Sequence, residues 1–519
     1  MKKINLSFVI VFALIACLVN TKSFAQKISE QTSTYVRNGL SIHFIPSNSF
    51  SPEIINSIKV SEKYDDNSFG DNILRANIAG NLQVTNKKGK NDKSSNSIDN
   101  EINSSDYKVI TDAIASQKIP NKILSKILLN EKGQLDFTKT IFPRGLYNAT
   151  DNTMITAQTS NESMTVLQTD AIFNVLKNIY FLVQLNGTVS TKSSKDGATY
   201  TVPFKSYLFQ VDLSDLINAN LFFKTFDKKD PSVSTKINDY TFNVKLISFA
   251  NGEGSTLDKE LEFEGLKLVS KPKSQQQIYK DLAAASVDES LVQHSNNYEP
   301  FKVRTRINSV GPITAKIGKK EGLKIDDHFE VFRNKIDEKT GDKFAKKIGY
   351  VRVAKVADNA KVSTGDSEPS RFYKAPAGSV EKNDVMKEIP ETGIQVGTEI
   401  LFGDGYTSPM VNIDYVTHLI RGNRLTASYM NYEGTSLLLA EARQIIQLNR
   451  LTFTPGFGYI FPLSSDGKAS EKPGGISTSF KVGLDFGKHF EINAGPRFLA
   501  DEAGNTMAAF GFGLRLFGF

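Results

Sequence analysis

Residues 479–487, Ser-Phe-Lys-Val-Gly-Leu-Asp-Phe-Gly, decide the fold of the C-terminal part of this 519-residue chain. The apolar side chains Phe480, Val482, Leu484 and Phe486 alternate with small or charged ones. A period of two predicts a β-strand with one apolar face. The same alternation recurs from about residue 397 to the last residue, so this whole region is expected to consist of strands.

Eight strands are predicted there, near residues 397–402, 410–420, 424–432, 435–448, 450–461, 476–487, 490–499 and 506–519. Most approach the ~9–11 residues that a tilted strand needs to cross a bilayer, and eight is the strand number of the smallest transmembrane barrels. In an eight-stranded antiparallel β-barrel over residues 395–519, the side chains expected to face the membrane are Phe453, Phe457, Tyr459, Phe461, Phe480, Val482, Leu484, Phe486, Phe510, Phe512, Leu514 and Leu516. The alternative is a soluble β-sandwich, which packs the same faces inward.

The chain ends with residues 511–519, Gly-Phe-Gly-Leu-Arg-Leu-Phe-Gly-Phe. This ending resembles that of small OmpA-type outer-membrane β-barrels, whose last strand closes on a C-terminal aromatic residue that the insertion machinery reads. The resemblance implies that Phe519 is the C-terminal signal of the barrel. In that family the apolar residues keep phase with the last aromatic, whereas here Arg515 is in phase with Phe519 and the apolar stripe from Phe510 to Leu516 is not. A bulge or a different topology is therefore expected.

The first residues predict export. Lys2 and Lys3 precede an apolar run from Leu6 to Val19 that is too short for a permanent membrane anchor, and Ser23-Phe24-Ala25 supplies small residues for cleavage before Gln26. Residues 1–25 are thus interpreted as a secretory signal peptide.

Cys17, the one cysteine of the chain, lies within this segment. The sequence Leu14-Ile15-Ala16-Cys17 looks like a lipobox, in which the cysteine would be lipidated. Ordinary cleavage after Ala25 is the favoured alternative, and it would leave a mature chain without disulfides or thiol chemistry.

The composition fits a folded exported protein, with 39% hydrophobic and 23% charged residues. The formal charge is +7, and loss of Lys2, Lys3 and Lys22 with the signal peptide leaves +4. Because this charge is small and spread out, nucleic acid is discounted as a partner.

Residues 26–295 are predicted to form an exported α+β domain. Amphipathic stretches near 119–129, 162–177 and 274–291 predict helices, and apolar runs near 179–185, 206–213 and 240–249 predict strands. The segment near 85–107 has almost no apolar residues, so a disordered loop is expected there.

Residues 300–390 contain short strands separated by charged turns, which predicts a small barrel or sandwich. The pattern Ile317-Gly318-x-x-Glu321-Gly322-Leu323-Lys324-x-Asp326-Asp327-x-Phe329-x-Val331 resembles the SH3-like module at the end of the flagellar assembly protein T family. The resemblance covers under a fifth of the chain and implies an envelope-associated binding or structural module.

No motif in the chain predicts catalysis, a metal site or a cofactor. The histidines are far apart and form no metal-binding spacing, and neither a nucleophile elbow nor a phosphate-binding loop is found. The histidines are His43, His294, His328, His418 and His489. The favoured hypothesis is a non-enzymatic cell-envelope protein: a multidomain α+β and all-β chain anchored in the outer membrane, with the membrane, envelope proteins or cell-wall polymer as partners. The alternative is a soluble or lipid-anchored periplasmic interaction protein with a C-terminal β-sandwich.

Overall fold

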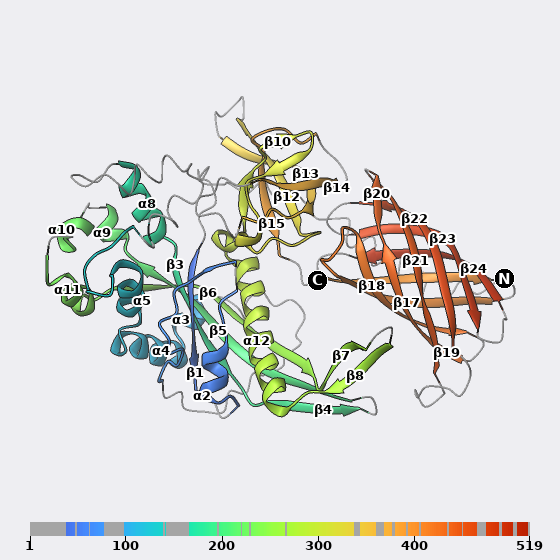
Figure 1. Ribbon diagram of the computed structural model, residues 1–519, viewed down its shortest axis with the longest axis horizontal. Helices are drawn as coiled ribbons and strands as arrows, with labels where there is room; N and C mark the ends of the chain where they lie inside the picture. The colour runs from blue at the N-terminus through green and yellow to red at the C-terminus, as the bar shows by residue number, and fades with distance from the viewer. Residues whose placement is uncertain are drawn as a thin grey trace.

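The computed structural model contains three bodies of secondary structure, coloured from blue to red along the chain in Figure 1. The predictions for residues 1–25, Cys17 and Phe519 lie outside the described residues. The structure describes residues 38–516 apart from 47–48, 62, 77–97, 139–140, 142–165, 195–196, 219–220, 228–229, 265–266, 337–342, 360–367, 376–378, 391–392, 404–405, 433–434, 449, 464–473, 487–489 and 502–505.

A six-stranded mixed sheet forms the centre of the N-terminal part, in the order β2-β1-β3-β5-β4 with β6 paired to β5. Strand β1 runs parallel to β3, whereas β5 pairs antiparallel with β3, β4 and β6. The strands are β1 (Gly39–Ile45), β2 (Asp65–Asp66), β3 (Ile179–Asn186), β4 (Ser190–Ser194), β5 (Gly197–Asp212) and β6 (Asn243–Leu257), and a separate hairpin joins β7 (Lys259–Glu264) to β8 (Lys267–Pro272).

Helices cover both faces of this sheet (Figure 1). Alternate residues of β3 belong to two different apolar clusters: Phe181 and Val183 pack on the side of α4, α5 and α8, and Tyr180 and Leu182 on the side of α2 and α12. A strand buried on both faces reads as a nearly continuous apolar run, as 179–185 does. The helices are α2 (Pro52–Ser57), α3 (Ile98–Ile102), α4 (Ser105–Ser116), α5 (Ile119–Leu128), α8 (Val166–Leu176), α9 (Ser214–Asn218), α10 (Phe222–Thr225), α11 (Val233–Asp239) and α12 (Gln275–Asn297).

The disordered loop expected near 85–107 is wrong for its second half, because α3 and the start of α4 occupy residues 98–107. Residues 85–97 lie outside the described part of the chain. The Ser104 side chain caps α4 by accepting a hydrogen bond from the Tyr107 backbone N–H at 3.1 Å, and Tyr207 of β5 donates to Glu101 at 2.5 Å. These contacts with a distant strand order a polar segment whose own composition could not predict it.

The middle part is a seven-stranded antiparallel sheet, here called the β-module, in the order β10-β11-β14-β13-β12-β15-β9. The turn on which the SH3-like resemblance rests is held by Glu321, whose carboxylate accepts from the Gly318 backbone N–H at 2.6 Å, and by Gly322 with φ of 68°. The likeness to an SH3-like module stays a prediction. The strands are β9 (Arg304–Arg306), β10 (Ser309–Val310), β11 (Ile313–Ala315), β12 (His328–Ile336), β13 (Lys343–Lys355), β14 (Ser370–Ala375) and β15 (Val385–Ile389).

The C-terminal part is a closed antiparallel β-barrel of eight long strands and the short β20, which confirms the predicted fold class. First and last strands close it, because β16 pairs with β24 from Val396↔Leu516 to Gly403↔Ala509, and β19 pairs with β21. The strands are β16 (Ile394–Gly403), β17 (Tyr406–Val416), β18 (Asn423–Tyr432), β19 (Thr435–Gln444), β20 (Ile446–Leu448), β21 (Leu451–Leu463), β22 (Gly475–Asp485), β23 (Phe490–Asp501) and β24 (Thr506–Leu516).

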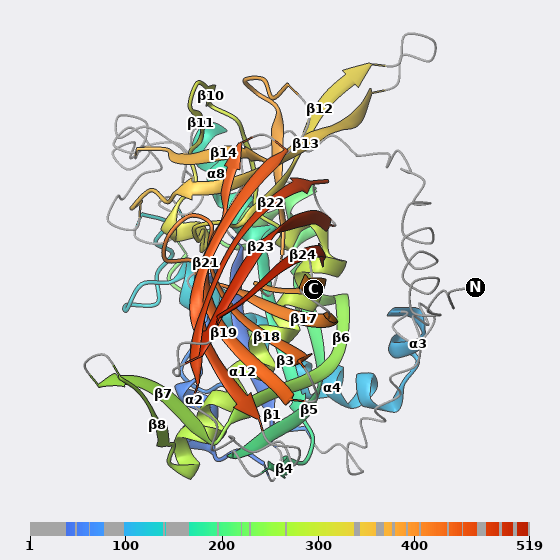
Figure 2. The ribbon, with the colours of Figure 1, turned by 90° about the vertical axis from the view of Figure 1, so that its right-hand side faces the viewer.

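The barrel has two ends, the rim and the distal end. The rim is the end at which β16 begins, β24 ends and residues 417–422 connect β17 to β18; the distal end is the opposite one, where β16 ends and β17 begins. The β-module lies beside the rim in both ribbon views (Figures 1 and 2). Among the described residues, no helix is long and apolar enough to cross a membrane.

Candidate functional site: the barrel surface, its interior and its rim

The outer surface of the barrel is apolar. Of the 29 exposed large hydrophobic side chains among the described residues, 24 lie between Ile394 and Phe512. Along each strand they alternate with buried residues, as the pattern of β22 shows from Gly475 to Asp485. The chain therefore concentrates its exposed apolar surface on one closed cylinder.

All twelve side chains predicted to face a membrane lie on this outer surface. Phe457, Tyr459, Phe461, Phe480, Val482, Leu484, Phe486, Phe510 and Phe512 are exposed, and Phe453, Leu514 and Leu516 are half-exposed. Whether lipid covers them belongs to the proposal below.

The bulge expected in the last strand is not found between Thr506 and Leu516. The pairing of β24 with both of its neighbours is continuous, without a shift in register. Arg515 points inward, where its Nε lies 2.8 Å from Asp414 and its Nη1 lies 3.4 Å from Glu491. The apparent break of phase thus arises because an inward position carries an ion-paired arginine, while the apolar stripe continues outward.

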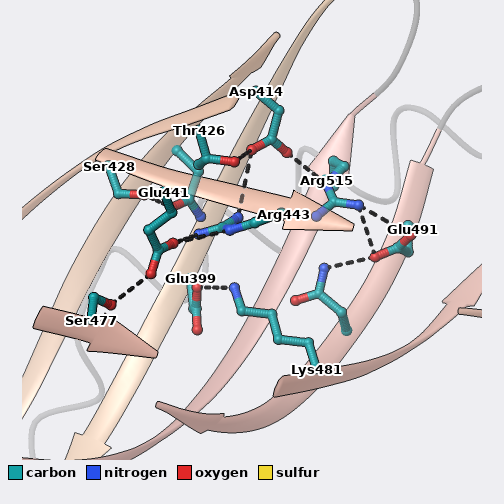
Figure 3. Close-up of polar contacts among 12 residues, drawn as sticks. Glu399, Asp414, Thr426, Ser428, Glu441, Arg443, Ser477, Lys481, Glu491 and Arg515 are labelled. Carbon is teal, nitrogen blue, oxygen red and sulfur yellow. Dashed lines mark hydrogen bonds and ion pairs between the residues drawn. The ribbon is translucent and has the colours of Figure 1, made fainter. Parts of the chain in front are cut away.

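A network of buried ion pairs fills the middle of the barrel (Figure 3). Glu441 of β19 is its centre: Arg443 Nη2 lies 2.5 Å from one carboxylate oxygen, and Arg497 of β23 and Ser477 of β22 donate to the other. Asp414 of β17 lies 3.5 Å from Arg443. Four strands are tied together through these side chains.

The charges within this network balance. Lys481 of β22 pairs with Glu399 of β16, and Asn493 donates to Glu491 at 3.0 Å. The ion pairs join four cations to four anions, namely Arg443, Lys481, Arg497 and Arg515 with Glu399, Asp414, Glu441 and Glu491. Buried charges are tolerated when each is paired and hydrogen-bonded, so the network packs the interior without a net charge.

Glycines on the inner face make room for these long side chains. A Cβ on Gly511 would lie 1.9 Å from the Glu399 carboxylate, and one on Gly458 would lie 2.7 Å from the Glu441 Cγ. The pair Gly511-x-Gly513 in the sequence therefore reflects side-chain packing inside a barrel.

An apolar layer closes the barrel interior toward the distal end. Its members come from the distal halves of the strands and are fully or nearly fully buried: Leu401, Met410, Met430, Leu437, Leu439, Ile460, Leu499 and Ala509. An eight-stranded barrel is narrow enough for side chains to fill. With the ion pairs below and this layer above, the described interior is occupied by side chains.

The β-module is fastened to the rim through Asp326. One oxygen of its carboxylate accepts from the Gly422 backbone N–H at 2.7 Å and from Arg424 Nη1 at 2.9 Å; the other accepts from the Tyr373 hydroxyl at 2.8 Å. His418 Nδ1 lies 2.6 Å from the Ile325 carbonyl oxygen and donates to it. These contacts, between residues 325–326 and 418–424, are called the rim joint.

The pKa values of the neighbouring residues Asp326 and Asp327 are shifted in opposite directions. Burial alone would raise the pKa of Asp326, but Arg424 and the hydrogen bonds it donates lower it, so Asp326 stays ionised in the joint. The pKa of Asp327 is raised to about 8, chiefly by burial and also by the nearby Glu388 carboxylate, although the hydrogen bond from the Lys324 backbone N–H and the charges of Lys324 and Lys63 act to lower it. Only one of these two carboxyls has a dedicated cation.

The N-terminal domain also contacts the β-module, next to Asp327. Lys63 Nζ lies 2.7 Å from Glu388, whose carboxylate also accepts from the Val303 backbone N–H at 2.8 Å, and Asn38 donates to the Pro300 carbonyl at 2.9 Å. The three bodies are thus joined in series by short polar contacts.

The histidines do not form a site. His43 and His294 are fully buried, and burial lowers the pKa of each to about 3; His294 bridges Ser206 and Ser248 at 3.0 and 2.9 Å. His328 is buried, and His489 lies outside the described residues. Over the part of the chain that the structure describes, no three His, Cys, Asp or Glu side chains gather to hold a metal ion.

The period-two pattern predicts the outer face of the barrel but does not reveal the pairing of charges inside it. Lys481, Asp485 and Arg515 alternate with the outward apolar residues, but a soluble sandwich would place the same charged residues on its surface, so this pattern alone does not distinguish the two folds. Buried charged side chains recur at inward positions of seven strands, and their pairing depends on contacts between residues up to 101 positions apart, such as Asp414 and Arg515.

The fold and this site define an eight-stranded β-barrel protein with an apolar exterior, an ion-paired interior and a β-module attached at one rim. No protein-family model and no curated protein sequence matches the chain. Among solved structures, the N-terminal β-barrel domain of Pseudomonas aeruginosa OprF is similar at 16% identity, covering 24% of this chain and 98% of that one, with a TM-score of 0.20. Neisserial surface protein A is similar at 15% identity, covering 24% and 94%, with a TM-score of 0.18.

Proposed function

We propose that this chain is a non-enzymatic outer-membrane protein in which the barrel is the anchor and the α+β domain with the β-module is the attached binding or structural part. The observation that carries the proposal is the reversed polarity of the barrel: phenylalanine, leucine and isoleucine lie outside, and paired charges lie inside. A closed barrel leaves no unpaired strand edge, which is what lipid requires of a spanning β-structure.

A soluble β-sandwich would bury these apolar faces against each other. With roughly 80 Å² of apolar surface on each of the 24 exposed side chains, the exterior exposes on the order of 2,000 Å², whereas the largest patch on a soluble monomer is about 300–600 Å². The strands have 10 to 13 residues, close to the length that crosses a bilayer at a tilt. Both features favour lipid around the barrel.

The orientation follows from the connections at the two ends. Small transmembrane barrels have short periplasmic turns and longer extracellular loops. The longest interstrand segment, residues 464–474, joins β21 to β22 at the distal end, whereas the β-module adjoins the rim. We therefore place the distal end outside the cell and the β-module and α+β domain in the periplasm, where envelope proteins or cell-wall polymer are the partner classes within reach.

The filled interior makes the barrel an anchor rather than a pore. Balanced ion pairs occupy the middle, and the apolar layer around Leu439 closes the distal end. Purified protein in a planar bilayer should give no steady single-channel conductance.

The test is membrane fractionation of cells that produce the full chain. The protein should enter the outer-membrane fraction, resist extraction by carbonate, and migrate differently in a detergent gel before and after heating. Export through residues 1–25, with or without lipidation at Cys17, is a separate part of the proposal, which the mass of the mature N-terminus resolves. Extraction by carbonate together with a lack of heat-dependent migration would overturn the anchor and favour the soluble or lipid-anchored periplasmic alternative.

A further inference from the structure

A group of cations lies on the β-module beside the barrel rim. Lys355 of β13 and Arg371 of β14 are directly opposite each other in the ladder, and both are exposed. Residues paired across two strands point to the same side of the sheet, so these two side chains share one face. Neither forms an ion pair with an acidic side chain of the described residues.

Tyr373 connects this face to the barrel. It lies two residues after Arg371 on β14, hence on the same face, and Phe372 between them is buried in the core of the β-module. The Arg421 guanidinium, from the connection between β17 and β18, lies over the Tyr373 ring with 3.8 Å from its Cζ to the ring centroid. Lys355 and Arg371 thus share the face of the sheet that carries Tyr373, and Arg421 lies over the Tyr373 ring; these three residues are called the rim cations.

The geometry leaves the charge of the rim cations available. Stacking occupies a face of the Arg421 guanidinium, while its N–H edges remain free to donate to a phosphate. The acid nearest to Tyr373 in the described contacts is Asp326, and its carboxylate is buried and already paired with Arg424. The rim cations are therefore not neutralised by the rim joint on which they border.

The residues before Arg421 place this group at the level of a lipid headgroup. Leu419 and Ile420, in the same rim connection, are 77% and 63% exposed. Apolar side chains at the end of a transmembrane strand pair, next to basic ones, are typical of the membrane–water interface. Figures 1 and 2 both show β14 close to the rim end of the barrel.

From these observations we propose that the rim cations bind the phosphate groups of anionic phospholipids in the leaflet that surrounds the rim. The inference rests on the proposed membrane anchor and deepens it, since it names the lipid class that the attached β-module contacts. Bound lipid would hold the β-module against the membrane surface in addition to the rim joint. Because basic residues near an anionic surface each add roughly a fivefold gain in binding, three of them are enough for a clear preference.

The experiment counts lipids bound to full-length protein refolded in mixed micelles, by native mass spectrometry, with phosphatidylglycerol compared to phosphatidylcholine. Wild-type protein should bind phosphatidylglycerol at least tenfold more tightly, and raising the salt from 0.1 to 0.5 M should weaken that preference. The variant with Lys355→Gln, Arg371→Gln and Arg421→Gln should lose at least tenfold. The charge-matched control with Lys335→Gln, Lys346→Gln and Lys382→Gln, which changes exposed lysines elsewhere on the β-module, should stay within twofold of wild type.

Two further measurements separate a failure of the membrane anchor from a failure of the proposed lipid site. Heat-dependent migration is measured on every variant, so loss of the barrel itself would be seen there and would count against the membrane anchor. With migration intact, equal binding of the two lipids by wild type, or full phosphatidylglycerol preference in the triple variant, would overturn the rim cations as a lipid site. Displacement of lipid by millimolar glycerol phosphate would show a site for a soluble phosphate and would equally overturn the assignment to the membrane.

Discussion

Asp326 of the β-module and Arg424 of the barrel, 98 positions apart in the chain, form a buried ion pair of 2.9 Å between Oδ2 and Nη1. The side chains are 0% and 4% exposed. The Gly422 backbone N–H donates to the same carboxylate oxygen at 2.7 Å. A carboxylate of the β-module is therefore buried at the barrel rim, where it is paired with an arginine of the barrel.

Asp326→Asn is expected to loosen the rim joint. The change leaves Arg424 buried without its charge partner, and breaking a buried pair costs about 3–5 kcal/mol. Hydrogen exchange at the Gly422 amide reports the joint directly, and its protection should fall on the order of a hundredfold. Asp358→Asn is the control, since Asp358 forms an exposed pair with Lys319 on the same β-module and should change little.

A double-mutant cycle tests whether the two residues act as a pair. Combining Asp326→Asn with Arg424→Gln should cost clearly less than the sum of the single changes, because the second substitution removes the charge that the first leaves unpaired. Additive effects would contradict the ion pair as the source of docking.

The rim joint should weaken as the pH rises from 6.5 to 8.5. Asp327 borders the joint, with its Oδ1 3.9 Å from His418 Nδ1, and its pKa is raised to about 8, far above its value in an unfolded chain, so the folded protein favours the protonated carboxyl. Stability from a raised pKa is lost as the pH rises through the folded-state value. Burial lowers the pKa of His418, so that neighbour is already neutral in this window. Asp327→Asn should flatten the pH profile of Gly422 exchange; an unchanged profile would show that Asp327 does not titrate in the joint.

The barrel could be predicted from the sequence because the alternation of apolar and polar residues is a local pattern. Each strand shows period two within ten or so residues, and most of the connections are short, so eight strands could be counted before any contact was known. Phe480 and Phe512 were placed on the outer face for this reason. By contrast, the choice between a membrane barrel and a soluble sandwich depends on the charged face of the strands. That face can be interpreted only when its ion pairs are known, such as that between Glu441 and Arg497, which lie 56 residues apart.

Where the sequence prediction failed, a long-range contact is the cause. The polar segment before Tyr107 is ordered as helix because Glu101 meets Tyr207 across 106 positions. The rim joint was equally out of reach of the sequence, because Asp326 and its partner Arg424 lie 98 positions apart and in different domains. Turn chemistry is local, but docking between domains is not.

Glu441→Gln should destabilise the barrel strongly. It removes the anion shared by Arg443 and Arg497 and leaves two buried cations facing each other, which is expected to cost about 3–5 kcal/mol. Urea unfolding of the refolded protein in lipid vesicles, followed by heat-dependent migration, gives the free energy of unfolding. Ala440→Leu, one residue away on the outer face, is the control and should be nearly neutral in lipid. A cost below about 1 kcal/mol for Glu441→Gln would mean that the network is hydrated rather than tightly paired.

A comparison of the two single variants Phe480→Arg and Phe486→Arg distinguishes lipid from water around the barrel. The two phenylalanines are 46% and 48% exposed, but Phe480 lies at the middle of β22 whereas Phe486 follows its last residue. In a bilayer an arginine costs about 2–4 kcal/mol at the midplane and about 0–1 kcal/mol near an interface, so the first substitution should be the more harmful by at least ~1 kcal/mol in vesicle unfolding. If water covered this surface, equal exposure would make the two changes equally mild. Equal effects would therefore exclude the membrane anchor, because depth is the only property of the surrounding medium in which these two positions differ.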